Sequence, residues 1–219
     1  WVRPEVDAAT GLPLGVTPES VGAAIAAHPD ARAVFVGDPS YVGTVGDVRG
    51  LADAAHEHGI PLVGDAAWAA DFGFHPDLPP HPPQLRLDAG VEATATTSPA
   101  GAILASIDAS RALLERNGRA LLAGAITATR HARERLRDIE GVTVLDGPGV
   151  DPLKLTLVLS GTGADGNAVE RDLIADGLPV ESADRDVLIA VVSIADTPQI
   201  LDRLADTIAA SIQRHRGTP

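Results

Sequence analysis

The sequence predicts an α/β fold, and the order of its patterns in the first 64 residues carries that prediction. Residues 32–37 and 60–64 are short apolar runs typical of buried strands, and helical patterns at 17–28 and 47–58 precede them. Two strands joined through a helix over this length form a βαβ unit, so the strands should be parallel and adjacent.

The ends of both predicted helices carry recognisable signals. Thr17 is a suitable N-cap with Pro18 at the first helical position, and Asp47 is a suitable N-cap for the second helix. Gly59 should end that second helix, because glycine adopts the left-handed conformation that often follows a helix. These signals support the βαβ assignment independently of the apolar runs.

The later part of the chain predicts a second, smaller unit. Prolines cluster in 71–90 without a periodic apolar pattern, and 98–140 is helical, which we expect as two helices broken near Asn117 and Gly118. We place a domain boundary near residue 140. The expected organisation is part of a large parallel-sheet domain in 1–140 and a small α+β domain in 141–219. In the small domain we expect strands at 142–145, 153–160 and 187–194 and helices at 168–177 and 197–213.

Composition excludes several classes of function. The formal net charge of −13 argues against nucleic acid and anionic membranes as partners, because binding to phosphates depends on Lys and Arg. The chain has no cysteine and one lysine, Lys154.

His56 and His58 lie two apart on a predicted helix and point to different faces, so we expect no metal site. The glycine-rich stretch 161–166 lacks the pattern of a phosphate loop and predicts a tight turn before a helix. We expect a cytoplasmic protein.

Polar residues follow both strands of the βαβ unit. Asp38 and Ser40 come after the first strand, and Asp65 follows the second. Ligands of open parallel sheets bind outside the carboxyl ends of the strands, which makes these residues candidates for a binding site. The alternative is that Asp65 caps a local turn, as aspartate often does.

Several segments together resemble the bacterial ornithine/lysine/arginine decarboxylases, which are pyridoxal-phosphate enzymes of fold type I. Each stretch is weak alone, but their order agrees along nearly the whole chain. The stretches are 29–34, 38–43 (Asp-Pro-Ser-Tyr-Val-Gly), 56–67 (ending Val-Gly-Asp-Ala-Ala), 74–79, 97–99, 104–108, 151–156 (Asp-Pro-Leu-Lys-Leu-Thr) and 179–181.

The resemblance implies a role for each candidate residue. Asp65 would pair with the protonated pyridine nitrogen, Ala67 would lie beside the ring, and Ser40 would line the pocket where the family usually has Thr. Trp68 would lie near the cofactor at a position where the family usually has His. Thr97 and Ser98 would approach the cofactor phosphate, across a dimer interface.

The resemblance also implies a Schiff-base lysine between Asp65 and Thr97, and the chain has none there. Lys154 matches a sheet position of the small domain, so we expect that it cannot substitute, and we predict no catalytic residue in this chain. The family's amino-terminal part, with its phosphate loop, would precede Trp1. We expect that the sequence is a longer enzyme with segments omitted; a degenerate paralogue and one part of a split enzyme are the alternatives.

The implied function is decarboxylation of an amino acid by a homodimer or larger assembly that uses pyridoxal phosphate, and we expect a basic amino acid as the substrate. The chain is expected to be incomplete and inactive alone. The alternatives are another fold type I reaction, such as transamination or aldol cleavage, and a catalytically dead partner subunit.

Overall fold

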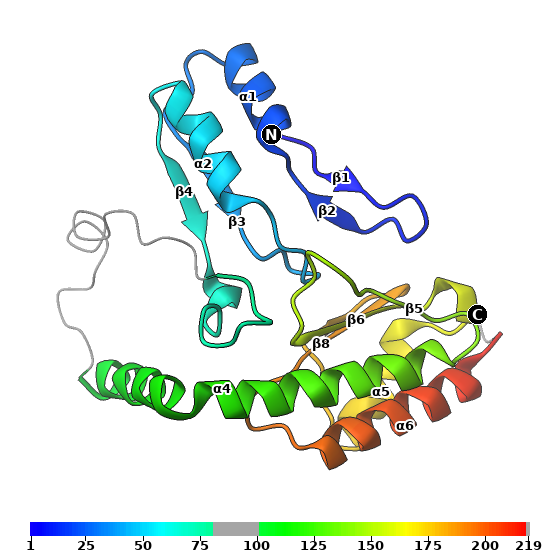
Figure 1. Ribbon diagram of the computed structural model, residues 1–219. Coiled ribbons are helices and arrows are strands. Elements are labelled where there is room, and N and C mark those ends of the chain that lie inside the picture. The colour runs from blue at the N-terminus through cyan, green and yellow to red at the C-terminus, as the bar shows by residue number, and fades with distance from the viewer. Residues whose placement is uncertain (81–100, 218–219) are drawn as a thin grey trace.

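The computed structural model describes residues 1–80 and 101–217. Figure 1 shows the amino-terminal strands and helices on one side, and the carboxyl-terminal sheet with α4, α5 and α6 on the other. The elements are β1 (Glu5–Val6), β2 (Pro13–Gly15), α1 (Pro18–Ala27), β3 (Val34–Gly37), α2 (Val48–Glu57), β4 (Leu62–Asp65), the 3-10 turn η1 (Ala67–Ala69), α4 (Gly101–Arg137), β5 (Thr143–Val144), β6 (Lys154–Val158), the 3-10 turn η2 (Ser160–Thr162), α5 (Gly166–Ala175), β7 (Ser182–Ala183), β8 (Val187–Val191) and α6 (Pro198–His215).

The predicted βαβ unit is confirmed. β3 and β4 are parallel neighbours, with Val34 opposite Leu62 and Gly37 opposite Asp65. The Thr17 side chain accepts a hydrogen bond from the Ser20 N–H (3.2 Å), which confirms it as the α1 N-cap. Asp47 caps α2 in the same way, by accepting from the Gly50 N–H.

The expectation that both of these strands are buried was wrong for the described residues. α1 and α2 pack against one face of the pair through Val21, Ile25 and Leu51, with Val34 and Leu62 partly buried beneath them. The opposite face carries Phe35 and Val63, which are 72% and 47% exposed. Apolar runs predicted the strands correctly, but a run alone does not reveal whether an element covers both faces.

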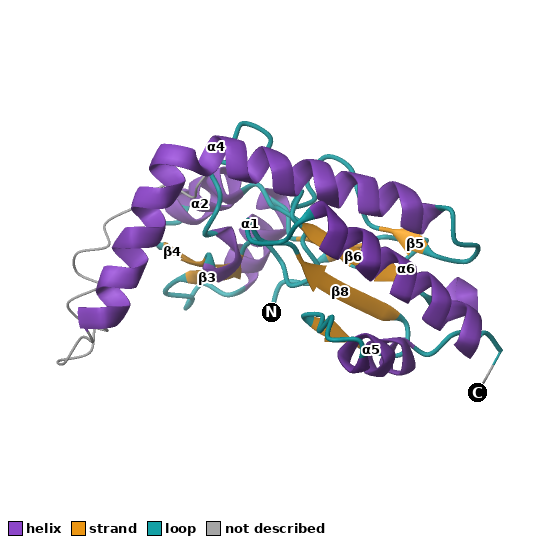
Figure 2. Ribbon diagram, turned by 90° about the horizontal axis from the view of Figure 1, so that it is seen from below, coloured by secondary structure: helices purple, strands orange, loops and turns teal. Residues whose placement is uncertain are grey.

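The predicted break near Asn117 and Gly118 is also wrong, because α4 is one helix of 37 residues. Gly118 is buried, and a Cβ there would lie 3.6 Å from the Cβ of Phe74. Glycine lowers helix propensity by about 1 kcal/mol, which packing along the rest of the helix outweighs. Figure 2 shows that α4 bends along its length without a break.

The carboxyl-terminal sheet has the order β5-β6-β8-β7, and all its strand pairs are antiparallel. α4 and α6 pack against each other, as do α5 and α6, and a large apolar core joins these helices to β6 and β8. Every residue of β6 is buried, so both faces of this strand are covered. Because α4 contributes Leu122 and Leu136 to this core, it packs with the unit that follows it. The domain boundary near residue 140 stays a prediction.

The glycine-rich stretch 161–166 forms a turn before α5, as predicted. Gly163 has a φ of 72°, and Asp165 is the N-cap of α5. Three short strands, β1, β2 and β7, were not predicted because elements of two or three residues leave no periodic signal. Among the described residues, no helix is long and apolar enough to cross a bilayer.

Candidate functional site

The carboxyl ends of β3 and β4 lie side by side, as the sequence predicted. The Asp38 N–H donates a hydrogen bond to the Asp65 carbonyl at 2.9 Å, one residue beyond the last pair of the ladder. The two loops that follow these strands therefore start from neighbouring positions at one edge of the sheet. This edge is where open parallel sheets bind their ligands.

Asp65 presents an exposed carboxylate at this edge. Its Oδ1 accepts a hydrogen bond from the Ala67 N–H (3.0 Å), in the turn that leads into η1. The alternative role of capping a turn is therefore present in the structure. A carboxylate accepts several hydrogen bonds, so this contact orients the group and leaves acceptor positions for a ligand.

Asp38 is buried and shapes the loop after β3. Its Oδ1 accepts a hydrogen bond from the Gly46 N–H at 2.6 Å. Burial raises the pKa of Asp38, and the Gly46 N–H opposes that rise. The Asp38–Pro39 peptide bond is cis. Asp38 thus ties the two ends of the loop together.

The Ser40 hydroxyl is bonded within the same loop. Ser40 Oγ and Thr44 Oγ1 are 2.6 Å apart, and Ser40 Oγ also accepts from the Thr44 N–H at 3.0 Å. The backbone closes the turn, because the Ser40 N–H donates to the Thr44 carbonyl. The Ser40 side chain therefore helps to fix the conformation of this loop.

Trp68 lies against a cluster that the sequence did not predict. Its ring meets that of Tyr41 edge to face, with centroids 5.7 Å apart. The Nζ of Lys154 lies 4.0 Å from the centroid of Trp68 and 5.5 Å from that of Tyr41. Nζ also donates to the carbonyl oxygens of Tyr41 (2.7 Å) and Ser40 (3.3 Å). The Tyr41 hydroxyl donates to Glu181 at 3.2 Å.

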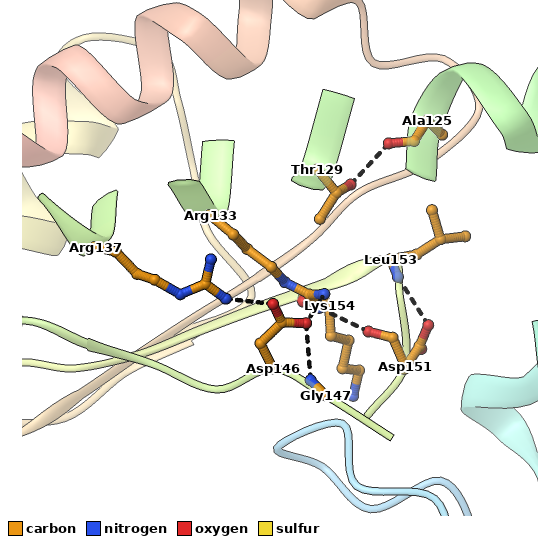
Figure 3. Close-up of polar contacts among 9 residues, drawn as sticks. All are labelled: Ala125, Thr129, Arg133, Arg137, Asp146, Gly147, Asp151, Leu153 and Lys154. Atoms are coloured by element: carbon orange, nitrogen blue, oxygen red, sulfur yellow. Dashed lines mark hydrogen bonds and ion pairs between the residues drawn. The ribbon is translucent and has the colours of Figure 1, made fainter. Parts of the chain in front are cut away.

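Lys154 stands at the start of β6, and Arg133 of α4 holds its backbone in place. Arg133 is buried; its Nη1 donates to Asp146 Oδ1 (2.9 Å), and its Nη2 donates to the carbonyls of Asp151 (2.9 Å) and Lys154. Arg137 also donates to Asp146. Figure 3 shows the Lys154 side chain running away from these arginines toward the pale-blue loop, the segment after β3.

Three groups near this junction have perturbed acidity. Burial lowers the pKa of Lys154, while Asp151 and Glu181 oppose the shift. Burial raises the pKa of Asp151. The Leu153 N–H donates a hydrogen bond to Asp151 Oδ1 at 2.9 Å and opposes that rise. Burial also raises the pKa of Asp71. Each shift follows from desolvation where the two halves of the molecule meet.

The remaining predicted residues divide into two groups. Ala67, two residues after Asp65, is exposed, and its place beside a ligand stays a prediction. Thr97 and Ser98 lie outside the described residues. Within 1–80 and 101–217, no three His, Cys, Asp or Glu side chains converge as metal ligands would.

Sequence reasoning missed how far the side chain of Lys154 reaches. The prediction that Lys154 lies in a strand is confirmed, but alternation along a strand does not show which distant segment a side chain contacts. The one available signal was composition. The only lysine of the sequence lies inside an apolar strand pattern, and lysine side chains are seldom buried.

The chain resembles curated arginine decarboxylases along nearly its whole length. That of Bacillus subtilis (strain 168) is 25% identical over 255 residues, covering 98% of this chain and 52% of the relative. That of Halalkalibacterium halodurans is 25% identical over 257 residues, covering 99% and 52%. The chain thus spans about half the length of these relatives. Both alignments exceed the 219 residues of this chain, so each relative has internal residues without a counterpart here. No family model matches the chain.

Solved structures show the fold. The lysine decarboxylase LdcF of Francisella novicida has a TM-score of 0.71 at 16% identity, over 97% of this chain and 42% of that one. Pyridoxamine-pyruvate aminotransferase of Mesorhizobium loti has a TM-score of 0.68 at 13% identity, over 91% and 64%. Serine palmitoyltransferase of Sphingomonas wittichii has a TM-score of 0.67 at 15% identity, over 91% and 59%. The chain thus shares its α/β fold with these fold type I enzymes.

The residues present fit one end of pyridoxal phosphate. An exposed carboxylate at a strand end, with the small Ala67 beside it, suits a partner for a protonated ring nitrogen. The aldehyde end has no such match, because the only lysine of the sequence is Lys154 and its Nζ is bonded to two carbonyls.

Proposed function

We propose that this chain is part of a pyridoxal-phosphate-dependent amino-acid decarboxylase of the ornithine/lysine/arginine type, and that it supplies the side of the site facing the ring nitrogen. The observation that carries the proposal is the exposed Asp65 carboxylate beside the end of β3, in a chain that aligns almost completely with arginine decarboxylases. The substrate class proposed is a basic amino acid, and the assembly a dimer or larger.

When bound, pyridoxal phosphate supplies an electron sink for the negative charge left on the substrate carbon after carbon dioxide departs. Asp65 would keep the proton on the ring nitrogen, because a nearby carboxylate favours the cationic form of that nitrogen. Ala67 would leave room beside the ring. Trp68 and the Ser40 loop would form a wall of the pocket and exclude water from it. Thr97 and Ser98 would approach the phosphate.

The chain does not provide an available amine, so we propose that it does not turn over substrate alone. The relatives' additional internal residues support an omitted segment as the source of that amine. The lysine count also favours a second candidate function, a cofactor-binding partner subunit without catalysis. Aminotransferases share the fold, so transamination is the competing reaction within the first proposal.

Cofactor binding by the purified chain tests the proposal. Wild-type protein mixed with pyridoxal phosphate should show induced circular dichroism in the cofactor absorption band. Asp65→Asn should weaken binding by on the order of tenfold or more, because the amide does not stabilise the cationic ring nitrogen. The matched control is Asp30→Asn, which changes an exposed carboxylate in the turn between α1 and β3.

Absence of an induced signal with wild type, or equal affinity in Asp65→Asn, contradicts the proposal. A protein expressed with an added lysine-bearing segment distinguishes the reactions, since decarboxylation releases carbon dioxide and an amine, whereas transamination yields a keto acid. Decarboxylation of arginine, lysine or ornithine is the expected result.

A further inference from the structure

Lys154 connects the carboxyl-terminal sheet to both loops of the candidate site. The residue is 1% exposed, and its Nζ meets the Ser40 and Tyr41 carbonyls on one side and the Trp68 ring on the other. Trp68 is three residues from Asp65. One ammonium group thus contacts the loop after β3 and the turn after β4.

Several contacts offset the cost of burying this ammonium group. Burying a charge is costly unless it is paired and hydrogen-bonded. Here two carbonyl oxygens accept from Nζ, the face of an indole lies at cation–π distance, and Asp151 and Glu181 add negative charge. Asp151 and Glu181 oppose the lowering of the Lys154 pKa by burial, and the contacts with the two carbonyls and the indole hold Nζ in place.

The loop is also shaped around the stem of Lys154. Gly43 has a φ of +91°, and a Cβ there would lie 3.0 Å from both Cβ and Cδ of Lys154, so a larger residue would push the loop away. Thr156, two residues along β6, donates to the Val42 carbonyl at 2.9 Å. The loop from Ser40 to Gly43 is therefore held against β6 at several points.

We propose that Lys154 is a positioning residue of the cofactor pocket: its ammonium fixes Trp68 and the Ser40–Tyr41 backbone beside Asp65, and it is not an aldehyde-binding amine. This inference rests on the proposed function for the identity of the pocket. The contact between Lys154 and Trp68 can be tested without any cofactor.

Tryptophan emission provides the first test. Trp1 is fully exposed, so Trp1→Phe leaves Trp68 as the only tryptophan of the chain. In that background, Lys154→Met should change the intensity and wavelength of Trp68 emission, because the cation over its ring is lost. Lys154→Arg should restore much of the original spectrum. The matched control is Leu155→Val, which perturbs the adjacent core position of β6 and should leave the emission unchanged.

Cofactor affinity and labelling provide the second test. Lys154→Met should bind pyridoxal phosphate about tenfold more weakly than wild type, with partial rescue by Lys154→Arg. Borohydride reduction of the folded wild-type protein with pyridoxal phosphate should leave Lys154 unmodified in peptide mass spectrometry, while urea-unfolded protein is labelled there. The labelling needs no variant, so it holds even where Lys154→Met does not fold.

The outcomes separate the two proposals. Labelling of Lys154 in the folded protein overturns the inference, as does unchanged Trp68 emission in Lys154→Met. If wild type shows no cofactor binding, the proposed function fails. The positioning role of Lys154 in a cofactor pocket then fails with it, even where emission confirms the contact with Trp68. Binding by wild type with equal affinity in Lys154→Met refutes the positioning role alone.

Discussion

The guanidinium of Arg133 is buried, and removing it should lower the stability of the protein. Its side chain is 6% exposed, and it donates to two backbone carbonyls and to Asp146. Arg133→Met keeps an unbranched stem but removes every donor. The Lys154 carbonyl would lose its arginine donor, and a buried carbonyl left without a donor costs about 1–3 kcal/mol. The Asp151 carbonyl keeps the Lys154 N–H at 3.1 Å, so its loss is smaller. Asp146 is 37% exposed and keeps Arg137, so its loss is smaller. We expect a total of about 2–4 kcal/mol, because one carbonyl loses its arginine donor and the Asp151 and Asp146 oxygens each lose one of their donors.

Urea unfolding followed by far-ultraviolet circular dichroism measures this change. Small domains are stable by about 5–15 kcal/mol, so the midpoint of Arg133→Met should fall by a large fraction of the wild-type value. Arg130→Met is the control: Arg130 is exposed on the same helix, and its replacement should cost less than about 0.5 kcal/mol. If the two variants unfold at the same urea concentration, Arg133 does not hold β6 and the reasoning is refuted.

Two further predictions concern stability. Gly141→Ala should lower the melting temperature strongly, because φ is +85° there and the new Cβ would lie 2.2 Å from the Gly161 carbonyl oxygen. The control is Gly124→Ala, in open space on α4, which should raise stability by about 0.5–1 kcal/mol. An unchanged melting temperature in Gly141→Ala would contradict this packing. The pKa of Asp172 is lowered, chiefly by a hydrogen bond from the Ser211 hydroxyl (2.6 Å), so its contribution is present above its usual pKa of 3.8 and lost as pH falls through the lower folded value. Asp172→Asn should lose that acid dependence and cost about 0.5–1 kcal/mol at neutral pH; an unchanged acid profile would count against the assignment.

The functional proposal depends on a division of roles between two loops and one strand. Asp65 supplies the carboxylate, and its own turn orients it. Lys154 and Trp68 hold the neighbouring wall, and Arg133 holds the backbone of Lys154. The side chains proposed to contact the cofactor therefore come from the amino-terminal half, while the groups that position them come from β6 and α4.

The sequence by itself determined the local features. The caps at Thr17 and Asp47, the parallel pairing of the two strands, the turn before α5 and the adjacent strand ends at Asp38 and Asp65 were all predictable. Each depends on interactions within a few residues, or on a topological rule that relates neighbouring elements. The resemblance to the decarboxylases likewise rests on short segments in a consistent order.

Only the tertiary structure decided the features that depend on what covers an element. Gly118 favours a break in a helix, yet α4 is continuous there and Gly118 lies beside Phe74. Apolar runs predict strands, yet Phe35 and Val63 are exposed because the described residues cover one face. Lys154 lies 113 residues from Tyr41 along the chain, and no periodicity predicts that its ammonium reaches that loop. Contacts between distant segments depend on the geometry of the whole chain, which local propensity does not encode.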